Sequence, residues 1–298
     1  MLAAVEETYC GLVAIVGRPN VGKSTLLNGL LGVKVAPVTP LPGTSRRGVR
    51  GILTDGSRQV VFVDTPGLAL PQNSLGRFMS REIRDALAEV DLVLWLTDLR
   101  HPPTVQDRLA AEALTKVSAA VWLVGNKLDA AQYPEEALAA YQALLPGAAQ
   151  WLSLSAQNDR HLAGLRAQVL AALPPGPFLY PPDMKSDQTR EQWAAELIRE
   201  AAMLELRQEL PYSVAVLVTD WQERPNGMLF IAATLVVEKK NHQGIVIGKG
   251  GAMIRAIGAR AREQLELFQG QKVYVQLEVV VREGWRDDPQ VLQELGYQ

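Results

Sequence analysis

Residues 17–24 read Gly17-Arg18-Pro19-Asn20-Val21-Gly22-Lys23-Ser24. The apolar run 12–16 before them predicts a buried strand, and the pattern of residues 25–31 after them predicts a helix. Strand, G-x-x-x-x-G-K-[ST] and helix together form the context of a phosphate-binding P-loop. A glycine-rich turn can match the motif by chance, but the flanking strand and helix weigh against that interpretation. The stretch therefore predicts a phosphate site at a strand–helix junction.

Each residue type in this loop suits phosphate chemistry. Gly17 and Gly22 let the backbone approach a phosphate, and the loop amides and the helix N-terminus direct partial positive charge toward it. Lys23 adds a full charge at the β- and γ-phosphates, and the Ser24 hydroxyl is placed to ligate Mg²⁺. The predicted nucleotide-binding residues of the loop are Gly17, Arg18, Pro19, Asn20, Val21, Gly22, Lys23, Ser24 and Thr25.

The composition is that of an ordinary globular protein. The chain has 298 residues, 48% hydrophobic and 21% charged, which is enough for two domains. A net charge of −2 excludes a chain that is basic throughout, so any nucleic-acid site must be local. Cys10 is the single cysteine, which excludes an intramolecular disulfide and fits a reducing compartment. No apolar run is long enough to span a membrane, and Glu6 and Glu7 do not suit a signal peptide, so we expect a cytoplasmic protein.

The first half of the chain has an α/β pattern. From residue 12 to about 172, predicted strands alternate with helical patterns, which predicts a mostly parallel sheet with helices on both faces. Residues 49–54 and 58–64 are predicted strands joined by a hairpin turn at 55–57, which places one antiparallel strand at an edge. Further buried strands are predicted at 91–97, 119–124 and 150–154.

Asp64-Thr65-Pro66-Gly67 follows the second strand of this hairpin. An Asp at the carboxyl end of a strand lies at the ligand edge of an open α/β sheet. There it can hold Mg²⁺ through water, and the Gly67 amide is free to bond a γ-phosphate. Alone, this sequence is equally well an ordinary turn. Its position downstream of the P-loop favours nucleotide contacts from Asp64, Thr65, Pro66 and Gly67.

Asn126-Lys127-Leu128-Asp129 follows the strand predicted at 119–124. A buried Asp129 carboxylate accepts hydrogen bonds from guanine N1–H and the 2-amino group, and it would reject adenine by about 10⁴ or more. Asn126 and the stem of Lys127 complete the predicted base pocket. Ser155-Ala156, after the strand at 150–154, carries the weakest signal, a backbone amide that could reach guanine O6.

In order, GRPNVGKS, a hydroxyl-containing segment, DTPG, NKLD and SA resemble the five motifs of translation-factor-class GTPases. The GRPN form of the loop resembles the Era, Der and MnmE group. The resemblance implies a switch I segment at Gly43, Thr44, Ser45 and Arg46, where family members have Thr-Thr-Arg. Ser45 matches the Mg²⁺-ligating position, but Thr44 stays open as the ligand. The implied metal ligands are Ser24, Ser45 and Asp64, and the implied catalytic residues are Lys23, Asn20 and Gly67.

Two positions bear on hydrolysis. Leu68 stands where Ras-type enzymes have the glutamine that orients the attacking water, so hydrolysis must be slow or use another group. In the family that this chain resembles, the residue matching Asn20 helps to hold a K⁺ ion beside the phosphates, and we carry this over as a hypothesis. Residues 36–48 and 68–80 are expected to move with the nucleotide state.

A proline-rich segment divides the chain. Residues 173–183 hold five prolines in eleven residues, which predicts a semi-rigid spacer without helix. The predicted division is a GTPase domain at 9–173, a linker at 174–188 and a second domain at 189–298. Within the second domain we predict a helix at 189–210, strands at 212–219 and 228–237, a helix at 252–268 and a strand at 272–281.

Gly248-Lys249-Gly250-Gly251 directly precedes the predicted helix 252–268. Alone, G-x-x-G is by default an ordinary glycine turn. However, residues 239–262 contain six Lys and Arg and no Asp or Glu, which favours a loop that binds a nucleic-acid backbone. The predicted RNA-binding residues are Lys239, Lys240, Gly248, Lys249, Gly250, Gly251 and Arg255.

The order helix, two strands, short helix, G-x-x-G, helix, strand resembles an α+β type II KH domain, whose loop clamps about four single-stranded nucleotides. One GTPase domain followed by one type II KH domain is the arrangement of the Era family, which segments 209–214 and 279–289 also resemble. The resemblance implies a GTP-hydrolysing switch, with Mg²⁺ and GTP or GDP as ligands. It would bind small-subunit ribosomal RNA near its 3′ end and act in assembly of the small ribosomal subunit. It also implies a monomer, with peripheral contact at the inner face of the cell membrane as an additional location.

Two other interpretations compete. In one, the KH domain binds RNA and the nucleotide domain is a static, non-hydrolysing scaffold, which Leu68 and Ser45 favour. GTP turnover discriminates it from the switch. In the other, a related GTPase acts in tRNA modification or on the large subunit, and the KH domain disfavours that interpretation.

Overall fold

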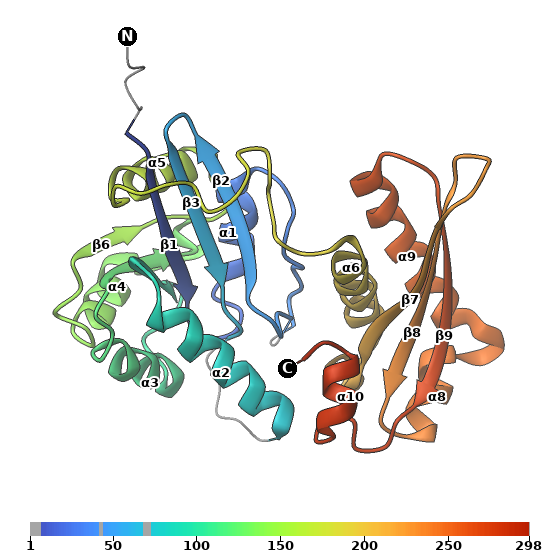
Figure 1. Ribbon diagram of the computed structural model, residues 1–298. Helices are drawn as coiled ribbons and strands as arrows, with labels where there is room; N and C mark the ends of the chain where they lie inside the picture. Colours follow the sequence, from blue (N-terminus) through green and yellow to red (C-terminus); the bar gives the residue numbers. More distant parts are fainter. Residues whose placement is uncertain (1–6, 42–43, 68–72, 298) are drawn as a thin grey trace, which may run out of the picture. The chain divides into compact units, whose positions relative to one another are not determined.

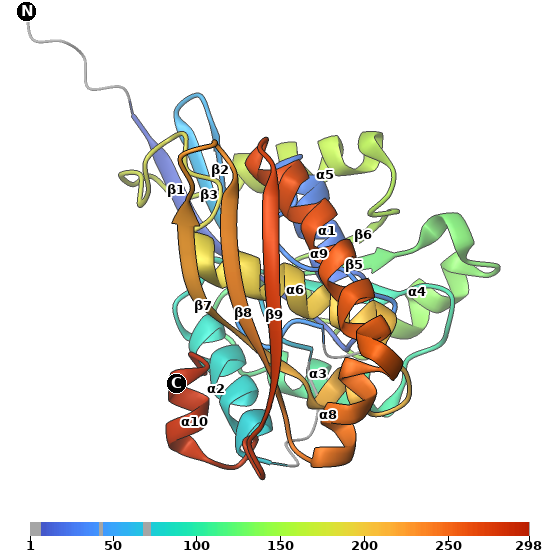
Figure 2. The same ribbon diagram turned by 90° about the vertical axis from the view of Figure 1, so that its right-hand side faces the viewer.

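The computed structural model describes residues 7–41, 44–67 and 73–297 and is drawn in Figures 1 and 2. It divides into two compact units. The first comprises residues 1–36, 45–71 and 79–187, and the second comprises residues 37–44, 72–78 and 188–298. Two short segments of the first half of the chain, 37–44 and 72–78, therefore belong to the unit formed by the C-terminal residues. The predicted boundaries at 173 and 188 stay predictions.

The first unit is built on a six-stranded sheet (Figure 1). Its strands are β1 (Tyr9–Val16), β2 (Val49–Asp55), β3 (Arg58–Asp64), β4 (Leu92–Asp98), β5 (Ala120–Asn126) and β6 (Gln150–Ser153). Their order is β2-β3-β1-β4-β5-β6, and among these pairs only β2 with β3 is antiparallel. The predicted mostly parallel sheet with one antiparallel edge strand is confirmed.

Helices pack on both faces of this sheet, as predicted. Helices α1 (Lys23–Leu31) and α5 (Asp159–Ala171) contribute buried leucines to the core on one face. Helices α3 (Val105–Leu114) and α4 (Pro134–Gln142) contribute to the core on the other face, which the end of α2 (Ser74–Ala88) also contacts. The short helix η1 (Leu128–Ala130) follows β5.

The carboxyl ends of four strands meet at one edge of the sheet. The parallel register pairs Ile15 of β1 with Asp64 of β3, and Asp98 of β4 with Asn126 of β5. Because parallel strands end at the same edge, residues from four separate stretches of sequence come together there. This edge holds the P-loop and the motifs that follow β3 and β5.

The proline-rich segment is irregular, as predicted, but it is not a free spacer. Backbone hydrogen bonds join Gly176 to Thr8, Cys10 to Pro174 and Ile52 to Lys185. The side chain of Gln59 also donates to Tyr180 O (2.8 Å). The segment up to residue 187 therefore packs along the first unit.

The second unit has a three-stranded sheet covered by two helices (Figure 2). Strands β7 (Ala215–Glu223) and β8 (Leu229–Val237) are antiparallel, and β9 (Val273–Val281) runs parallel to β8. Helices α6 (Arg190–Glu205) and α9 (Ala252–Gln269) pack on the sheet around an apolar core. Helix α8 (Lys240–Ile247) and the short helix η2 (Lys249–Gly251) separate β8 from α9. The predicted order of elements is confirmed.

Two local predictions need correction, and one helix was not predicted. Helix α6 ends at Glu205, not at residue 210, because Leu206 adopts an extended conformation. Residues 212 and 213 are helical, not extended, since they close α7 (Leu210–Ser213), in which Pro211 occupies the first turn. The sequence analysis also missed α10 (Pro289–Glu294), which Asp288 caps through hydrogen bonds from Gln290 N and Val291 N. None of the helices among the described residues combines the length and apolar content needed to cross a membrane.

Candidate nucleotide and nucleic-acid sites

The P-loop lies between β1 and α1, as predicted. Gly22 adopts φ 104° immediately before α1, and its Cα faces the side-chain amide of Asn126 so closely that a Cβ would collide with it. Gly67 packs against the ring of Pro19, where a Cβ would lie 2.7 Å from Pro19 Cγ. The P-loop is thus in direct contact with Asn126 at the end of β5 and with Gly67 after β3, and glycine is required at both contacts.

Gly22→Ala is expected to weaken GDP binding by about a hundredfold, because the methyl group displaces Asn126 and breaks its hydrogen bonds. Titration with a fluorescent GDP analogue measures the change. Gly32→Ala is the matched control: Gly32 also has a positive φ (69°), at the other end of α1, but a Cβ there meets nothing within 4 Å. That variant should lose stability and keep its affinity for GDP. Equal affinity in both variants would contradict the prediction.

Lys23, the first residue of α1, turns back to the backbone of the P-loop. Its Nζ donates to Gly17 O (3.1 Å) and Arg18 O (3.2 Å). Burial lowers the pKa of Lys23 to about 8. An anion bound in the loop would stabilise the charged form, which suits a side chain whose predicted role is to hold phosphates.

Three oxygen-bearing side chains converge beside Lys23. Ser24 Oγ donates to Asp64 Oδ2 (2.7 Å), and Ser45 Oγ lies 3.1 Å from Ser24 Oγ and 3.5 Å from Asp64 Oδ2. Asp64 is fully buried, which raises its pKa, while Lys23 and the two hydroxyls oppose the rise. Among the described residues, no group hydrogen-bonds to Asp64 Oδ1. Mg²⁺ prefers oxygen ligands. The hydroxyls of Ser24 and Ser45 and the carboxylate of Asp64, whose Oδ1 has no hydrogen-bond partner among the described residues, therefore fit the predicted Mg²⁺ ligand set.

The hydroxyl of Thr44 takes part in different contacts. It lies 2.6 Å from Thr39 Oγ1 and donates to Leu41 O (2.9 Å). Of the two open candidates for a metal ligand, Ser45 is therefore the one that the structure brings to Ser24 and Asp64. Arg46 is buried (4% exposed), and Gly43 and Leu68 lie outside the described residues. Thr65 and Pro66 are buried, and Thr65 Oγ1 donates to Ile15 O (2.9 Å).

Asn126 joins three of the predicted motifs. Its Nδ2 donates to Val21 O (2.7 Å), and its Oδ1 accepts from Ala156 N (2.9 Å). The Ser155 amide donates to His161 Nδ1 (3.0 Å). Both amides of the Ser155-Ala156 pair thus have protein partners, so a contact of either amide with guanine O6 would require that amide to be shared.

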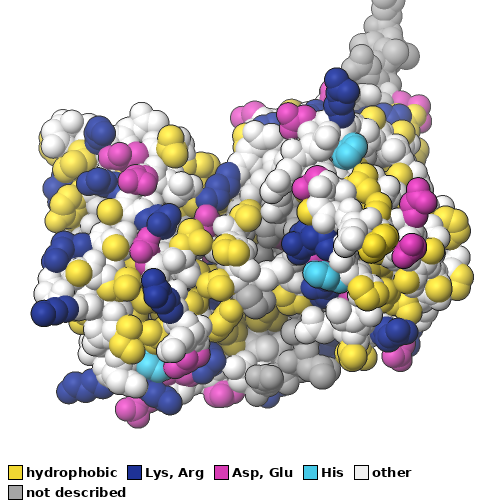
Figure 3. Space-filling view, turned by 180° about the vertical axis from the view of Figure 1, so that it is seen from behind, with side chains coloured by type: hydrophobic (Ala, Val, Ile, Leu, Met, Phe, Trp, Pro, Cys, Tyr) yellow, Lys and Arg dark blue, Asp and Glu magenta, His cyan; other side chains and the backbone are white. Residues whose placement is uncertain are grey.

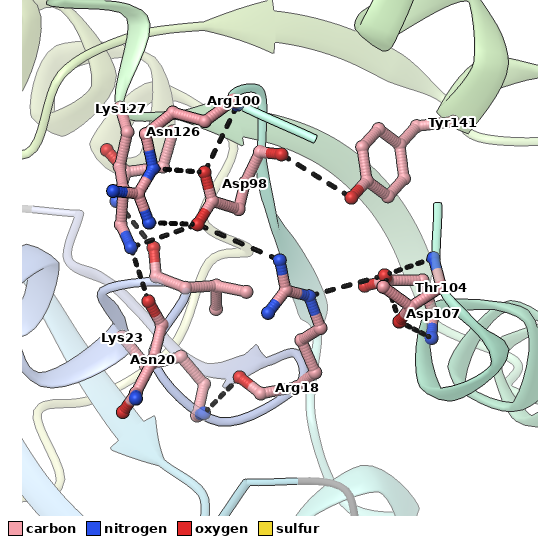
Figure 4. Close-up of polar contacts among 11 residues, drawn as sticks. Arg18, Asn20, Lys23, Asp98, Arg100, Thr104, Asp107, Asn126, Lys127 and Tyr141 are labelled. Carbon is pink, nitrogen blue, oxygen red and sulfur yellow. Dashed lines mark hydrogen bonds and ion pairs between the residues drawn. The ribbon is translucent and has the colours of Figure 1, made fainter. Parts of the chain in front are cut away.

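Lys127 follows Asn126 at the same edge (Figure 4), and Asp129 lies in η1 directly after it. Lys127 Nζ donates to Asn20 O and to Asp98 Oδ2 (3.0 Å). Asp129 lies in η1 and is exposed, whereas the sequence argument treated it as buried. Among the described residues its carboxylate has no hydrogen-bond or ion-pair partner, so it remains available to a base. Burial of this carboxylate would have to come from the ligand itself.

The Arg18 side chain points toward the end of β4 and toward α3. Its Nε lies 3.3 Å from Asp107 Oδ2 and its Nη2 lies 3.7 Å from Asp98 Oδ2 (Figure 4). Any phosphate contact from Arg18 is therefore left to its backbone. The sequence analysis missed Asp98, although it ends a buried strand at the ligand edge, the same signal that identified Asp64.

The glycine loop of the second unit has an unusual backbone. Gly248, Gly250 and Gly251 have φ values of 73°, 57° and 77°, which leave the backbone without side chains where a phosphate would approach. Arg255 Nη1 donates to Gly250 O (2.7 Å) and braces the loop. The side chains of Lys239, Lys240, Lys249 and Arg255 are exposed. Figure 3 shows one face of this unit, and Lys and Arg side chains (dark blue) are spread over that face.

Family models match both parts of the chain. A model described as 50S ribosome-binding GTPase matches residues 12–127, and a model described as KH domain matches residues 209–286. Among similar proteins, GTPase Era of Deinococcus deserti is 54% identical over 295 residues, covering 98% of this chain and 96% of that protein. GTPase Era of Deinococcus radiodurans is also 54% identical, over 297 residues, with the same coverage.

Solved structures agree with these matches. A crystal structure of Aquifex aeolicus Era bound to GDP·AlF4⁻, a single-site variant, is 36% identical with a TM-score of 0.91 and covers 97% of this chain and 99% of that one. A crystal structure of Era in complex with MgGDPNP and nucleotides 1506–1542 of 16S ribosomal RNA has 35% identity, the same TM-score and the same coverage. From the relatives that match along nearly its whole length and from its two domains, the chain belongs to the Era family of GTPases.

Proposed function

We propose that this GTPase is a nucleotide-controlled RNA-binding protein that acts on small-subunit ribosomal RNA near its 3′ end during assembly of the small subunit. One observation carries the proposal: a nucleotide site with all its motifs and a KH domain with a basic glycine loop occur in one chain. The Era structure with MgGDPNP and 16S ribosomal RNA supports it, since the match covers 97% of this chain and 99% of that chain. The KH domain favours the small subunit although the GTPase model is described as 50S ribosome-binding.

The proposed nucleotide site binds GTP through the P-loop and reads the base through Asn126, Lys127 and Asp129. Lys23 holds the β- and γ-phosphates, and the oxygens of Ser24, Ser45 and Asp64 would hold Mg²⁺. Bound Mg²⁺ would neutralise charge on the phosphate oxygens during hydrolysis. The Gly67 amide is proposed to bond the γ-phosphate.

The site differs from that of Ras-type GTPases in the residue that would orient the attacking water. Position 68 is a leucine, which cannot orient a water. We propose that Asn20 supports a K⁺ ion beside the phosphates in its place. Asn20 has a positive φ (64°), a conformation that asparagine tolerates better than most residues, and its carbonyl is tied to Lys127. The turn that presents Asn20 is thus held in one shape.

The proposed RNA site is the glycine loop with its basic surroundings. Lys239, Lys240, Lys249 and Arg255 supply positive charge for the phosphates of a single strand, and the glycines let the strand approach the backbone. Arg260, in contrast, is paired with Glu205 (2.6 Å), so it contributes less to the proposed groove.

The segments of the chain that make up the second unit favour a switch over a static scaffold. Residues 37–44 include part of the predicted switch I, and residues 72–78 follow the Asp64-to-Gly67 motif; both segments belong to the compact unit that contains the KH domain. Arg199 of α6 donates to Thr44 O. Asp287 accepts from Ser74 N (2.9 Å) and Ser74 Oγ (3.1 Å). Segments expected to respond to GTP therefore pack on the RNA-binding unit.

GTP hydrolysis with and without RNA tests the proposal. We expect slow turnover in K⁺ buffer that accelerates when an oligonucleotide of the small-subunit 3′ tail is added, and a slower rate when Na⁺ replaces K⁺. Turnover that is absent, or indifferent to the oligonucleotide, would favour the scaffold. An equal rate in Na⁺ would remove the K⁺ proposal alone.

Gly250→Asp should weaken binding of the same oligonucleotide by about tenfold and leave GTP affinity unchanged, because it adds negative charge to the loop. A Cβ at Gly250 meets nothing within 4 Å, and Asp tolerates the positive φ. Gly250→Asn, which has nearly the same shape without the charge, is the control and should bind RNA more tightly than the Asp variant. Equal binding by the two variants would argue against a phosphate contact at this loop.

A further inference from the structure

Asp98 ends β4 at the ligand edge of the first sheet, and its side chain is only 1% exposed. The register places it directly beside Asn126 of β5. Asp98 thus lies one strand away from residues 126–129, which we call the base-reading loop. Its side chain is inside the protein and does not face solvent.

The Asp98 carboxylate is surrounded by cationic side chains (Figure 4). Oδ1 accepts from Arg100 N (3.2 Å) and Arg100 Nε (3.0 Å). Oδ2 accepts from Arg100 Nη2 (2.8 Å) and Lys127 Nζ (3.0 Å), and it lies 3.7 Å from Arg18 Nη2. Burial alone would raise the pKa of Asp98, but the hydrogen bonds from Arg100 and Lys127 outweigh it and hold the pKa well below its usual range.

Lys127 needs such an anchor because its backbone is strained. Lys127 has φ 64°, a left-handed conformation that is costly for a residue with a long side chain, and Asn20 has the same φ. Lys127 Nζ donates to Asn20 O and so joins the strained Lys127 to the P-loop turn at Asn20. Lys127 is also the residue before η1, which carries Asp129, so its conformation sets where the Asp129 carboxylate points.

We propose that Asp98 is a positioning residue for guanine-nucleotide binding, which acts by holding Lys127 so that the P-loop turn at Asn20 and the base-reading loop keep their relative position. This inference rests on the proposed nucleotide site. Arg18 and Arg100 keep the carboxylate itself in place, and Lys127 transmits the constraint. The alternative is a carboxylate that only balances buried charge and stabilises the fold.

Release of a fluorescent GDP analogue distinguishes these roles. Asp98→Asn keeps the shape of the side chain and removes the charge, and it should speed GDP release by about tenfold to a hundredfold, the value of a hydrogen bond to a charged group. Because Asp98 acts through Lys127, the same substitution in a Lys127→Met background should add little further effect. Asp91→Asn is the matched control. Asp91 lies just before β4, at the opposite end of that strand, and accepts from Leu12 N (2.8 Å), so GDP release should not change.

A second variant covers the case in which Asp98→Asn does not fold. Asp98→Glu keeps the charge and moves the carboxylate by about one methylene group, so it should fold with a melting temperature near that of the unaltered protein and still release GDP faster. Unaltered release in both Asp98 variants, or effects of Asp98→Asn and Lys127→Met that multiply, would overturn the proposal. Failure of the unaltered protein to bind GDP would instead overturn the nucleotide site itself.

Discussion

Asp129→Asn is expected to weaken GTP and GDP binding by about a thousandfold or more and to shift the preference toward xanthine nucleotides. A carboxylate accepts hydrogen bonds from guanine N1–H and the 2-amino group, whereas the new amide would place a donor against that amino group. Xanthine has a carbonyl at this position and can accept from the amide. Competition of GDP and XDP against a fluorescent nucleotide measures both changes.

The structure makes this experiment easy to interpret. Asp129 is exposed and, among the described residues, its carboxylate has no hydrogen-bond or ion-pair partner, so the substitution should leave the fold intact. Asp85→Asn, another exposed aspartate of the first unit, is the control and should change neither affinity nor preference. A GTP preference that survives Asp129→Asn would remove Asp129 as the base-reading residue.

Arg199→Met is expected to abolish most of the acceleration of GTP hydrolysis by RNA while RNA still binds. Arg199 is 1% exposed in α6, where it donates to Thr44 O and pairs with Glu196. Methionine fills similar space but leaves the Thr44 carbonyl and the Glu196 carboxylate without this partner. A buried polar group left unpaired, such as the Thr44 carbonyl, costs about 1–3 kcal/mol, and the partly exposed Glu196 carboxylate should cost less. Residues 37–44 should then detach from the unit more readily. Hydrolysis rates with and without the oligonucleotide, together with urea unfolding, measure the two effects.

Arg190→Met separates this contact from a general effect of removing an arginine from α6. Arg190 begins the same helix, its side chain is 58% exposed, and it pairs with the neighbouring Glu191, so the variant should respond to RNA normally. Full stimulation by RNA in Arg199→Met would show that the Thr44 contact does not transmit the nucleotide state.

Local sequence patterns were enough to predict a feature wherever one short stretch of the chain contains all the residues that define it. The strand, loop and helix around Gly17 to Ser24 lie within about 25 consecutive residues, and the apolar periods of the strands predicted their burial. Because parallel strands end at one edge, Asp64 and Asn126 could be placed at the ligand side before the structure was known. The same rule would have identified Asp98, which the motif list passed over because no named motif includes it.

Other features depended on partners that no window of sequence contains. The exposure of Asp129 depends on how η1 turns after the strained Lys127, and Thr44 and Ser45 differ by one residue in sequence but face different partners. The proline-rich segment was predicted to be a spacer because a high proline content indicates a stiff chain. Its hydrogen bonds to Cys10 and Ile52 could not be predicted in this way, since they form only after the sheet has formed.

By itself, then, the sequence determined the α/β class of the first unit, the order of elements in the second and the chemistry of each motif, since these follow from spacing, residue type and hydrophobic period. Only the tertiary structure decided that residues 37–44 and 72–78 belong to the KH-containing unit, that Arg199 bonds the Thr44 carbonyl 155 residues away, and that Asp98 anchors Lys127. Such contacts form between residues distant in the chain, and their energy depends on burial and geometry that exist only once the core has packed.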